Sequence, residues 1–489
     1  MAQTSSQRSL EQAVAQFVTG FDLGQLTPGA LDGVKRLMED QLGLQVGCSR
    51  LPWCGQVEQY ALAQSRPGRS RIMASDRLVS AIDAAFVNAT FGHSFEYDDA
   101  HRQSASHPGS CVVSSALAVA EELGATLDEV VAAIVVGYEV YTRLGCLAAP
   151  DLLTRGFHPH AILSTFGAAA VTARLRGFDE RTTGHALAIA MSHASGTTEY
   201  TSSGGSVKRV HSGIGTRSGI VAADMASAGI TGPLDYLTGP KGFYRTFLQR
   251  PVASDALSWF EPSAPFQIEK VWIKPHLCCG CIHAYIDAAR QLRDRAGDIT
   301  GLTIRIQSSA NTVVGTKNIH AYAPETIEHV QYSLPVQMAF TLLGLGNGYL
   351  VHLGYLDGKL DLSPDGQILK TARMIEIIED PELDKRYPGK FVADVTATFR
   401  DGTSQHVFVE DSAGTVENPM SQKMLDEKFS EIAAAVLDEG RVAAFLKGIK
   451  ALDGRASAAS LTALSSPSGG SREAGRREPE MAIGKALSQ

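Results

Sequence analysis

The sequence has little of what marks a secreted or membrane protein. Seven of its 489 residues are cysteine, an odd number without framework spacing, which favours free thiols over a disulfide scaffold. The most hydrophobic run, Val130 to Gly137, is much shorter than the roughly 20 residues that cross a bilayer. Residues 1–20 have helical apolar spacing without a long apolar stretch, so we expect no signal peptide. These features predict a cytoplasmic protein with no membrane partner.

The sequence also lacks an excess of positive charge and the common nucleotide motifs. It carries 44 Lys and Arg against 52 Asp and Glu, a net charge of -8, which makes nucleic acid an improbable partner. It has no GxxxxGK[ST] loop, and no strand pattern precedes the glycines around Ile214. Its 44% hydrophobic and 20% charged residues are typical of a folded protein, long enough for several domains.

Apolar spacing predicts helices for most of the first half of the chain. Residues 8–265 repeat apolar side chains at i, i+3 and i+4. Thr126 and Glu129 form a capping-box pattern, and Gly124 is positioned to end the preceding helix. We therefore expect a helical domain over residues 1–266.

The pattern changes after residue 266. Alternating residues around 302–306 and on both sides of Asp401-Gly402 predict strands, with a hairpin at the latter, and helical patterns such as ILKTARMIEIIED (368–380) lie between them. The sequence thus predicts an α+β lid domain at 267–410, inserted into a mostly α protein. Helical pattern returns over 411–453. Residues 454–489 are rich in Ser, Gly, Ala and Arg, so we expect a disordered tail.

Residues 93–110, HSFEYDDAHRQSASHPGS, place acids and histidines before an apolar helix. Glu96, Asp98 and Asp99 lie in the same short segment as His93, His101 and His107, and imidazoles beside carboxylates suit proton transfer or metal binding. A polar loop that caps the following helix would explain part of the same pattern.

A second histidine motif, RGFHPH (155–160), precedes another predicted helix. The positive end of a helix disfavours the imidazolium form, so His158 could stay neutral and act as a base. The alternative is a capping or packing role for this histidine.

Residues 202–219, SSGGSVKRVHSGIGTRSG, have the composition of an anion site. Two consecutive glycines free the backbone, hydroxyl side chains surround them, and Lys208, Arg209 and His211 follow at an expected helix N-terminus. A carboxylate fits this segment better than a nucleotide phosphate does.

Residues 274–283, KPHLCCGCIH, combine a lysine with three cysteines and two histidines. Adjacent cysteines bind a metal poorly, and the rest of the sequence offers no second cysteine pair to complete a site, so we predict no metal here. Lys274 offers a second cation for an anionic substrate, and Cys279 offers a small polar side chain to line the substrate pocket. A buried thiol cluster is the alternative.

These four blocks, in this order, resemble the MmgE/PrpD family, which includes 2-methylcitrate dehydratases, cis-aconitate decarboxylases and iminodisuccinate epimerase. The resemblance covers about residues 10 to 450. The matching positions are Glu96-Tyr97-Asp98-Asp99, His107-Pro108, Gly156-Phe157-His158, Lys208-Arg209-Val210-His211-Ser212-Gly213, Lys274 with Cys278-Cys279 and His283, and Ser333-Leu334-Pro335.

The resemblance implies a two-domain fold made of a helical domain from both chain ends and an inserted lid. It also implies a homodimer and a cofactor-free active site between the domains. The chain departs from the family pattern at Glu96, which replaces the usual first Asp, at Ala100, where Thr is frequent, and at Pro275-His276-Leu277. These positions face substrate in the family, so the substrate class stays open.

The resemblance leads us to expect a cofactor-independent lyase of a small polycarboxylate, most simply the dehydratase of a 2-methylcitrate-like hydroxy acid. A cis-aconitate-type decarboxylase or an epimerase is the alternative within the family, and a non-catalytic metal- or ligand-binding protein is the alternative outside it. The expected catalytic residues are His107, His158, Lys208, Asp98 and Asp99. The expected substrate-binding residues are Lys274, Arg209, His211, Cys279 and Glu96.

Overall fold

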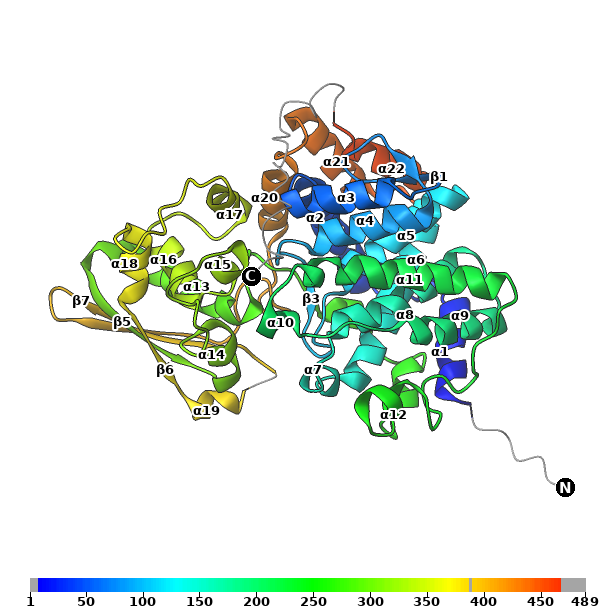
Figure 1. Ribbon diagram of the computed structural model, residues 1–489, viewed down its shortest axis with the longest axis horizontal. Helices are drawn as coiled ribbons and strands as arrows, with labels where there is room; N and C mark the ends of the chain where they lie inside the picture. The colour runs from blue at the N-terminus through cyan, green and yellow to red at the C-terminus, as the bar shows by residue number, and fades with distance from the viewer. Residues whose placement is uncertain (1–7, 387–388, 468–489) are drawn as a thin grey trace, which may run out of the picture.

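The computed structural model describes residues 8–386 and 389–467, which form a helical domain and a smaller domain with a β-sheet (Figure 1). A long helix, α6 (Leu127–Ala148), runs through the helical domain, with α5 (Pro108–Leu123) and α8 (Pro159–Leu175) packed against it. Helix α6 is long and apolar enough to cross a membrane, but 94% of its apolar window is buried inside the protein. It is therefore the core helix of this domain.

The other elements of the helical domain surround these three helices. They are α1 (Leu10–Gly20), α2 (Pro28–Cys48), α3 (Pro52–Leu62), α4 (Ala81–His93), α7 (Asp151–Thr154), α9 (Glu180–His193), α10 (Tyr200–Ser203), α11 (Val207–Ser227) and α12 (Phe243–Leu248), with short strand pairs β1 (Pro67–Arg71) with β2 (Leu78–Val79) and β3 (Ala100–His101) with β4 (Val271–Trp272).

The local signals for helix ends are confirmed. The Thr126 hydroxyl accepts a hydrogen bond from the Glu129 backbone, while the Glu129 carboxylate accepts one from the Thr126 backbone. Gly124 ends α5 in the left-handed conformation, with φ 70°. Close helix packing depends on small residues, since an added Cβ at Gly219 would lie 2.5 Å from the Thr165 carbonyl oxygen of α8.

The second domain contains a four-stranded sheet in the order β6 (Ile375–Glu379), β5 (Ile299–Ile306), β7 (Ala393–Phe399), β8 (Ser404–Val409). Strands β5 and β6 are parallel and the other pairs are antiparallel. The predicted hairpin at Asp401-Gly402 is confirmed, and Gly402 has φ 80° in its turn. The remaining elements are α13 (His283–Leu292), α14 (Ser308–Val314), α15 (Ile327–Gln331), α16 (Leu334–Leu342), α17 (Tyr349–Leu356), α18 (Gln367–Arg373) and α19 (Pro381–Asp384).

One predicted helix of this domain is wrong in its second half. Helix α18 ends at Arg373, and Ile375 to Glu379 form strand β6. The isoleucines at 375 and 377 are buried while the intervening Glu376 is exposed, so the alternating pattern dominates once parallel pairing with β5 is available.

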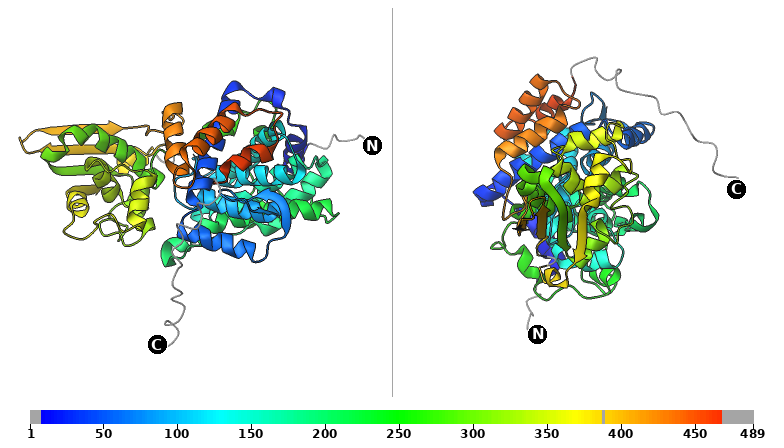
Figure 2. Two further views of the ribbon diagram at one scale, coloured as in Figure 1. Left: turned by 90° about the horizontal axis from the view of Figure 1, so that it is seen from above. Right: turned by 90° about the vertical axis from the view of Figure 1, so that its left-hand side faces the viewer.

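The segment from 267 to 277 lies on the helical domain, although we expected the lid to begin at 267. Strand β4 pairs with β3 of the helical domain, whereas the apolar core around the sheet draws on residues from Cys278 to Val409. The chain then returns in α20 (Gln422–Ala433) and α21 (Glu439–Ala451), which pack on α2 (Figure 2). Both chain ends therefore build the helical domain.

The expectation of a disordered tail from residue 454 is wrong for its first part. Residues Ala458–Thr462 form α22, Ala458 and Leu461 are buried, and the Ala458 amide donates to the Ala125 carbonyl. The Thr462 hydroxyl also donates to buried Glu121. The docking of this short helix depends on contacts with residues far along the chain, which composition alone does not reveal. Residues 468–489 lie outside the described residues.

Candidate active site

The histidine and acid motifs meet where the helical domain faces the sheet domain. The loop from α4 to α5 lies beside the N-termini of α5, α8 and α11. Pro108 and Pro159 occupy the first turns of α5 and α8, so His107 and His158 are the N-cap residues of two neighbouring buried helices. Two of the four sequence motifs thereby place equivalent imidazoles at one end of the helix bundle.

Glu96 joins the two lysines that the sequence singled out. Its carboxylate pairs with Lys208 through Oε2 and with Lys274 Nζ at 2.9 Å through Oε1. The Tyr332 hydroxyl, which comes from the sheet domain, lies 3.2 Å from Glu96 Oε2 and 3.1 Å from Lys208 Nζ. Glu96 has φ 56°, a left-handed conformation that a non-glycine residue adopts at a cost in free energy, and from this conformation its carboxylate contacts both ammonium groups.

The charges of this group stabilise one another. Burial alone would raise the pKa of Glu96, but the two lysines outweigh it and hold that pKa well below its usual range. Burial lowers the pKa of Lys208, but Glu96 reverses this and holds it well above its ordinary value. All three groups are therefore ionised near neutral pH, with one more positive than negative charge.

Asp98 connects this group to the histidines. Its Oδ2 lies 2.7 Å from His93 Nδ1, and its Oδ1 lies 3.8 Å from His107 Nδ1 and 4.0 Å from Lys274 Nζ. Burial raises its pKa, but His93 and His107 lower it further, to about 2. Asp98 Oδ1 has no hydrogen-bond partner among the described residues although it is fully buried. One carboxylate oxygen is thus available beside the histidines.

Four more hydrogen bonds and contacts complete the histidine cluster, which we define as His93, His107, His158, His160 and His211. His158 Nδ1 lies 2.8 Å from His211 Nδ1, and His160 Nδ1 lies 2.7 Å from the Tyr141 hydroxyl. The rings of His93 and His160 have centroids 4.3 Å apart, and His107 Nδ1 donates to the Asp99 carbonyl at 2.7 Å. With Nδ1 of His107 protonated, its Nε2 is the basic atom.

Burial disfavours the charged form of three imidazoles of the cluster, those of His107, His158 and His211. Burial lowers the pKa of His107 to about 4, against the opposing charge of Asp98. Burial likewise lowers the pKa of His211 to about 4, and that of His158 lies well below its ordinary value, with His93 adding to the effect. Near neutral pH these rings can accept a proton, and an anion bound beside them would make the imidazolium form more favourable.

Two expected site residues, Asp99 and Arg209, are engaged elsewhere. Both carboxylate oxygens of Asp99 are engaged, by the Gly109 amide at 3.0 Å and the Tyr138 hydroxyl at 2.8 Å, so this carboxyl holds the N-terminus of α5. Arg209 stacks on Trp53, 3.8 Å from the ring centroid, and pairs with Glu328. Neither residue directs its charge at the histidine cluster.

Cys279 lies at the edge of the site. Its amide donates to the Gln331 carbonyl at 3.0 Å, and its thiol is hydrogen bonded to Cys281, which is the main cause of its lowered pKa. Gln331 in turn donates to the Phe95 carbonyl, next to Glu96. The cysteine segment therefore supports the loop that carries Glu96.

Sequence reasoning missed four residues of the site. His93 and His160 were visible in the two histidine motifs but carried no separate signal. Tyr332 directly precedes the Ser333-Leu334-Pro335 block, which pointed to its neighbourhood. Lys428, from α20, pairs with Asp40 at 2.5 Å and donates to the Tyr97 and Lys274 carbonyls at 2.9 Å, a role that no local pattern marks.

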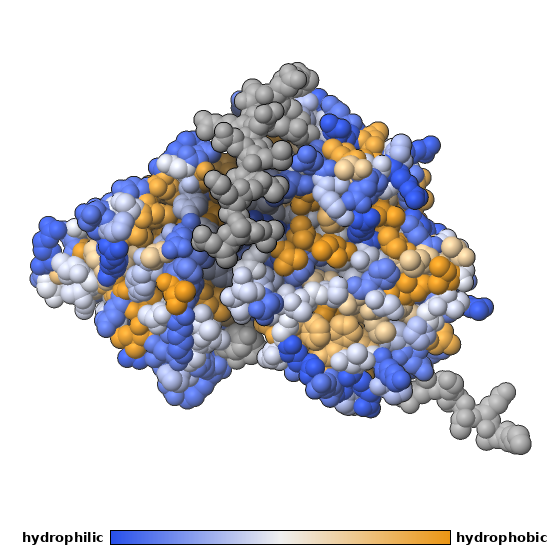
Figure 3. Space-filling view, viewed as in Figure 1, coloured by the Kyte–Doolittle hydropathy of each residue, from blue (hydrophilic) through white to orange (hydrophobic). Residues whose placement is uncertain are grey.

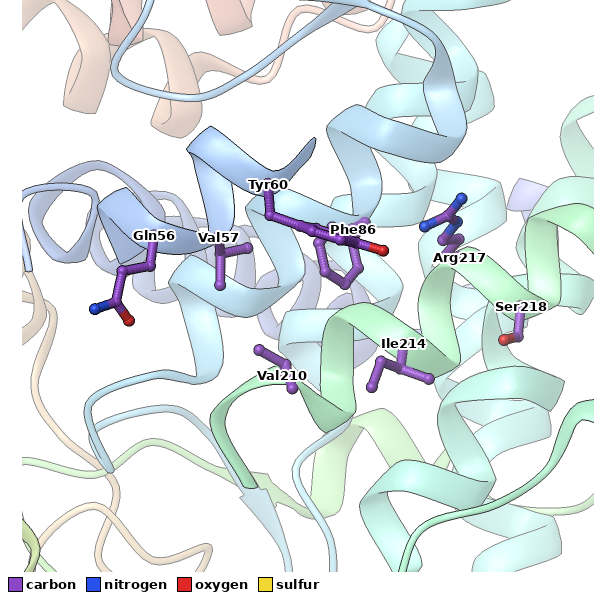
Figure 4. Close-up of a pocket in the computed structure, with 8 residues that line it drawn as sticks. All are labelled: Gln56, Val57, Tyr60, Phe86, Val210, Ile214, Arg217 and Ser218. Carbon is purple, nitrogen blue, oxygen red and sulfur yellow. The ribbon is translucent and has the colours of Figure 1, made fainter. Parts of the chain in front are cut away.

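A separate cavity of about 380 Å³ opens on the outer side of α11 (Figure 4). Tyr60 and Val57 of α3, Phe86 of α4, and Val210 and Ile214 of α11 line it, with Arg217 as its one charged neighbour. Its lining is mostly apolar and lacks convergent acids or bases, so the histidine cluster with Glu96 and its lysines is the candidate active site.

The comparisons with known proteins identify the family of this chain. The MmgE/PrpD N-terminal domain matches residues 12–255, and the MmgE/PrpD C-terminal domain matches residues 276–453. The chain is 25% identical over 478 residues to the cis-aconitate decarboxylase of Aspergillus terreus, which covers 90% of this chain and 92% of that protein. It is also 25% identical over 478 residues to the human cis-aconitate decarboxylase, with 94% of each chain covered. With both family domains matched in order and a two-domain fold to carry them, this chain belongs to the MmgE/PrpD family.

Proposed function

We propose that this protein is a lyase that needs no cofactor and acts on a small polycarboxylate bound between its two domains. The proposal rests on one observation: Lys208 and Lys274 both pair with the buried carboxylate of Glu96. Asp98 lies within 4.0 Å of Lys274 and of His107, and so connects this group to the histidines. Two ammonium groups that already hold one carboxylate, in a largely water-free place, are suited to hold a carboxylate of the substrate.

Within this class we propose the decarboxylation of an unsaturated tricarboxylate of the cis-aconitate type. Relatives with that activity in their names match at least 90% of this chain. Dehydration of a 2-methylcitrate-like acid, which we expected first, has no specific support from these relatives. The comparisons favour decarboxylation over dehydration.

The chemistry of this reaction sets what the site must do. The carboxylate that leaves as carbon dioxide is the one on the saturated carbon next to the double bond, and the electron pair of the broken C–C bond forms a new double bond from that carbon to the nearer alkene carbon. The former π electrons move to the carbon that carries another carboxylate, and this carbon takes up one proton. Each turnover therefore consumes one proton, and it develops negative charge beside groups that are already anionic.

The residues of the site can meet both demands. Lys208 and Lys274 offset the substrate's charge, and Tyr332 can donate a hydrogen bond to the same carboxylate. His107 is the candidate proton donor, because a bound polyanion would raise its low pKa and charge the ring. His158, with His211 behind it, is the second candidate. Binding should therefore be accompanied by proton uptake.

A proton NMR assay of candidate substrates tests the proposal. The protein is incubated with cis-aconitate, citrate and 2-methylcitrate in buffered deuterium oxide. We expect loss of the vinyl signal of cis-aconitate, two new terminal-alkene signals and one equivalent of carbon dioxide. Loss of water from 2-methylcitrate would replace decarboxylation by dehydration, and deuterium uptake without loss would indicate an epimerase. No change in any acid, together with metal bound at the histidine cluster, would support a non-catalytic binding protein.

We also propose that the protein works in the cytoplasm as a homodimer, as the family resemblance implies. Exposed apolar side chains lie around the cavity on α11, including Tyr60, Val207 and Ile214, with exposed fractions of 52%, 45% and 40%. Hydrophobic residues also gather on the helical domain in the space-filling view (Figure 3). Light scattering during size exclusion tests the state, and a single-chain mass across concentrations would contradict it.

A further inference from the structure

A group of metal-ligating side chains lies in the sheet domain, apart from the histidine cluster. His320, Glu325 and His329 each offer a ligand atom, and these atoms lie within 4.8 Å of one another. In the parts of the chain that the structure describes, this is the one group of three or more such residues that meets this spacing. The two imidazole rings are stacked, with centroids 3.6 Å apart and planes 9° apart.

The three side chains of this group are accessible from solvent. Both histidines are only half-buried and Glu325 is exposed, so a hydrated ion can reach them. The 3.3 Å hydrogen bond from the Glu325 amide to His329 Nδ1 is long, and a tilt of the rings would let both nitrogens face one ion.

We propose that His320, Glu325 and His329 form a surface site for a divalent transition-metal ion such as zinc. Two imidazoles and one carboxylate, with water in the remaining position, are a donor set that zinc accepts at about 2.0–2.2 Å from each ligand. The site differs from the histidine cluster in place and in composition, and it does not depend on the proposed function.

An ion bound at this site would link two segments of the sheet domain that lie near the helical domain. His320 lies in the loop before α15, and His329 lies on α15 itself. The same short helix carries Glu328, which pairs with Arg209, and is followed directly by Tyr332, which contacts Lys208. A bound ion would tie the loop to α15 and so stabilise the helix that reaches across to the helical domain.

Zinc titration of chelator-treated protein tests the site. We expect binding to weaken at least about tenfold in His320→Ala and in His329→Ala, because each loses one of three protein ligands. His406→Ala is the matched control, since His406 is an exposed histidine of the same domain beside a single aspartate, Asp394. Its affinity should equal that of the wild type.

Two further measurements locate the ion. Anomalous scattering at the zinc edge should place a peak among the three side chains. Hydrogen exchange of residues 316–332 should slow when zinc is added to the wild type but not to His329→Ala. Equal zinc affinity in all variants, or a peak only at the histidine cluster or the cysteines, would overturn the proposal.

Discussion

The two sides of the candidate active site are built differently. On the helical side, histidines at the ends of buried helices are held by partners from the same domain, such as Tyr141 for His160 in the first turn of α8 and Asp98 for His93 at the end of α4. On the other side, the contacts come from the five-residue helix α15 and from Tyr332 directly after it. The groups that we propose to transfer protons are thus fixed in a packed core, whereas the contacts from the sheet domain depend on one short helix and its neighbour, which we expect to move more easily.

The largest expected effect comes from the histidine side. His107→Ala and His158→Ala should each lower turnover by roughly 10² to 10⁴, because an acid or base held at the reacting atoms is lost. His352→Gln, a buried histidine of the sheet domain, is the control and should keep nearly full activity. Steady-state rates with thermal melting measure both effects, and near-normal turnover in the two active-site variants would refute their roles.

Lys428 tests how firmly the helical side is fixed. Lys428→Met should reduce the free energy of unfolding by about 3 to 5 kcal/mol, since it leaves Asp40 buried without its cation. Lys423→Met, on the exposed face of the same helix α20, should change stability little. Urea unfolding of both variants makes the comparison, and equal midpoints would show that the Asp40 pair contributes nothing.

The docked tail is expected to matter less, but measurably. A chain that ends at residue 455 should lose about 2 to 4 kcal/mol of stability relative to one that ends at 467, because buried Leu461 and Ala458 are removed. A tail that is disordered throughout, as composition alone predicts, would contribute nothing to stability. Matching melting curves for the two truncated chains would show that α22 contributes nothing.

The smallest expected effect is a pH dependence of stability that arises from a buried histidine of the sheet domain. His352 is buried and forms hydrogen bonds with the Gln337 side chain and the Gly348 carbonyl. Burial lowers the pKa of His352 to about 4. Between pH 6.5 and about 4 the unfolded chain binds a proton that the folded protein does not, so stability falls as the pH falls. The wild type should lose about 2 kcal/mol more than His352→Gln from pH 7 to 5. Parallel pH profiles in chemical denaturation would contradict this sign.

Much of the fold follows from local sequence patterns, because they report local physics. Capping at Thr126, the turn at Gly402 and the helix starts after His107 and His158 each depend on a few neighbouring residues. Strand β6 and helix α22 depend on partners far along the chain, β5 and the residues around Ala125, and local periodicity does not contain them.

The same distinction holds for the site. Motifs supplied Glu96, His107 and Lys208, which the fold brings to one place. Motifs could not show that both oxygens of the Asp99 carboxyl accept hydrogen bonds from Gly109 and Tyr138, because these contacts depend on the packing of α5 on α6. Arg209 looked equivalent to Lys208, but a helix turns successive residues by about 100°, so the two side chains diverge.

The central claim is that Lys208 and Lys274, gathered around Glu96, hold a carboxylate of the substrate. Calorimetric titration with propane-1,2,3-tricarboxylate, which has no double bond to rearrange, tests it in the wild type, in Lys208→Met and in Arg217→Met as a control on the outer side of α11. We expect Lys208→Met to weaken binding by about 2 to 4 kcal/mol, as for the loss of one partner of a buried charge pair, and Arg217→Met to bind normally. Equal affinities in all three proteins would remove Lys208 from the site and contradict this account.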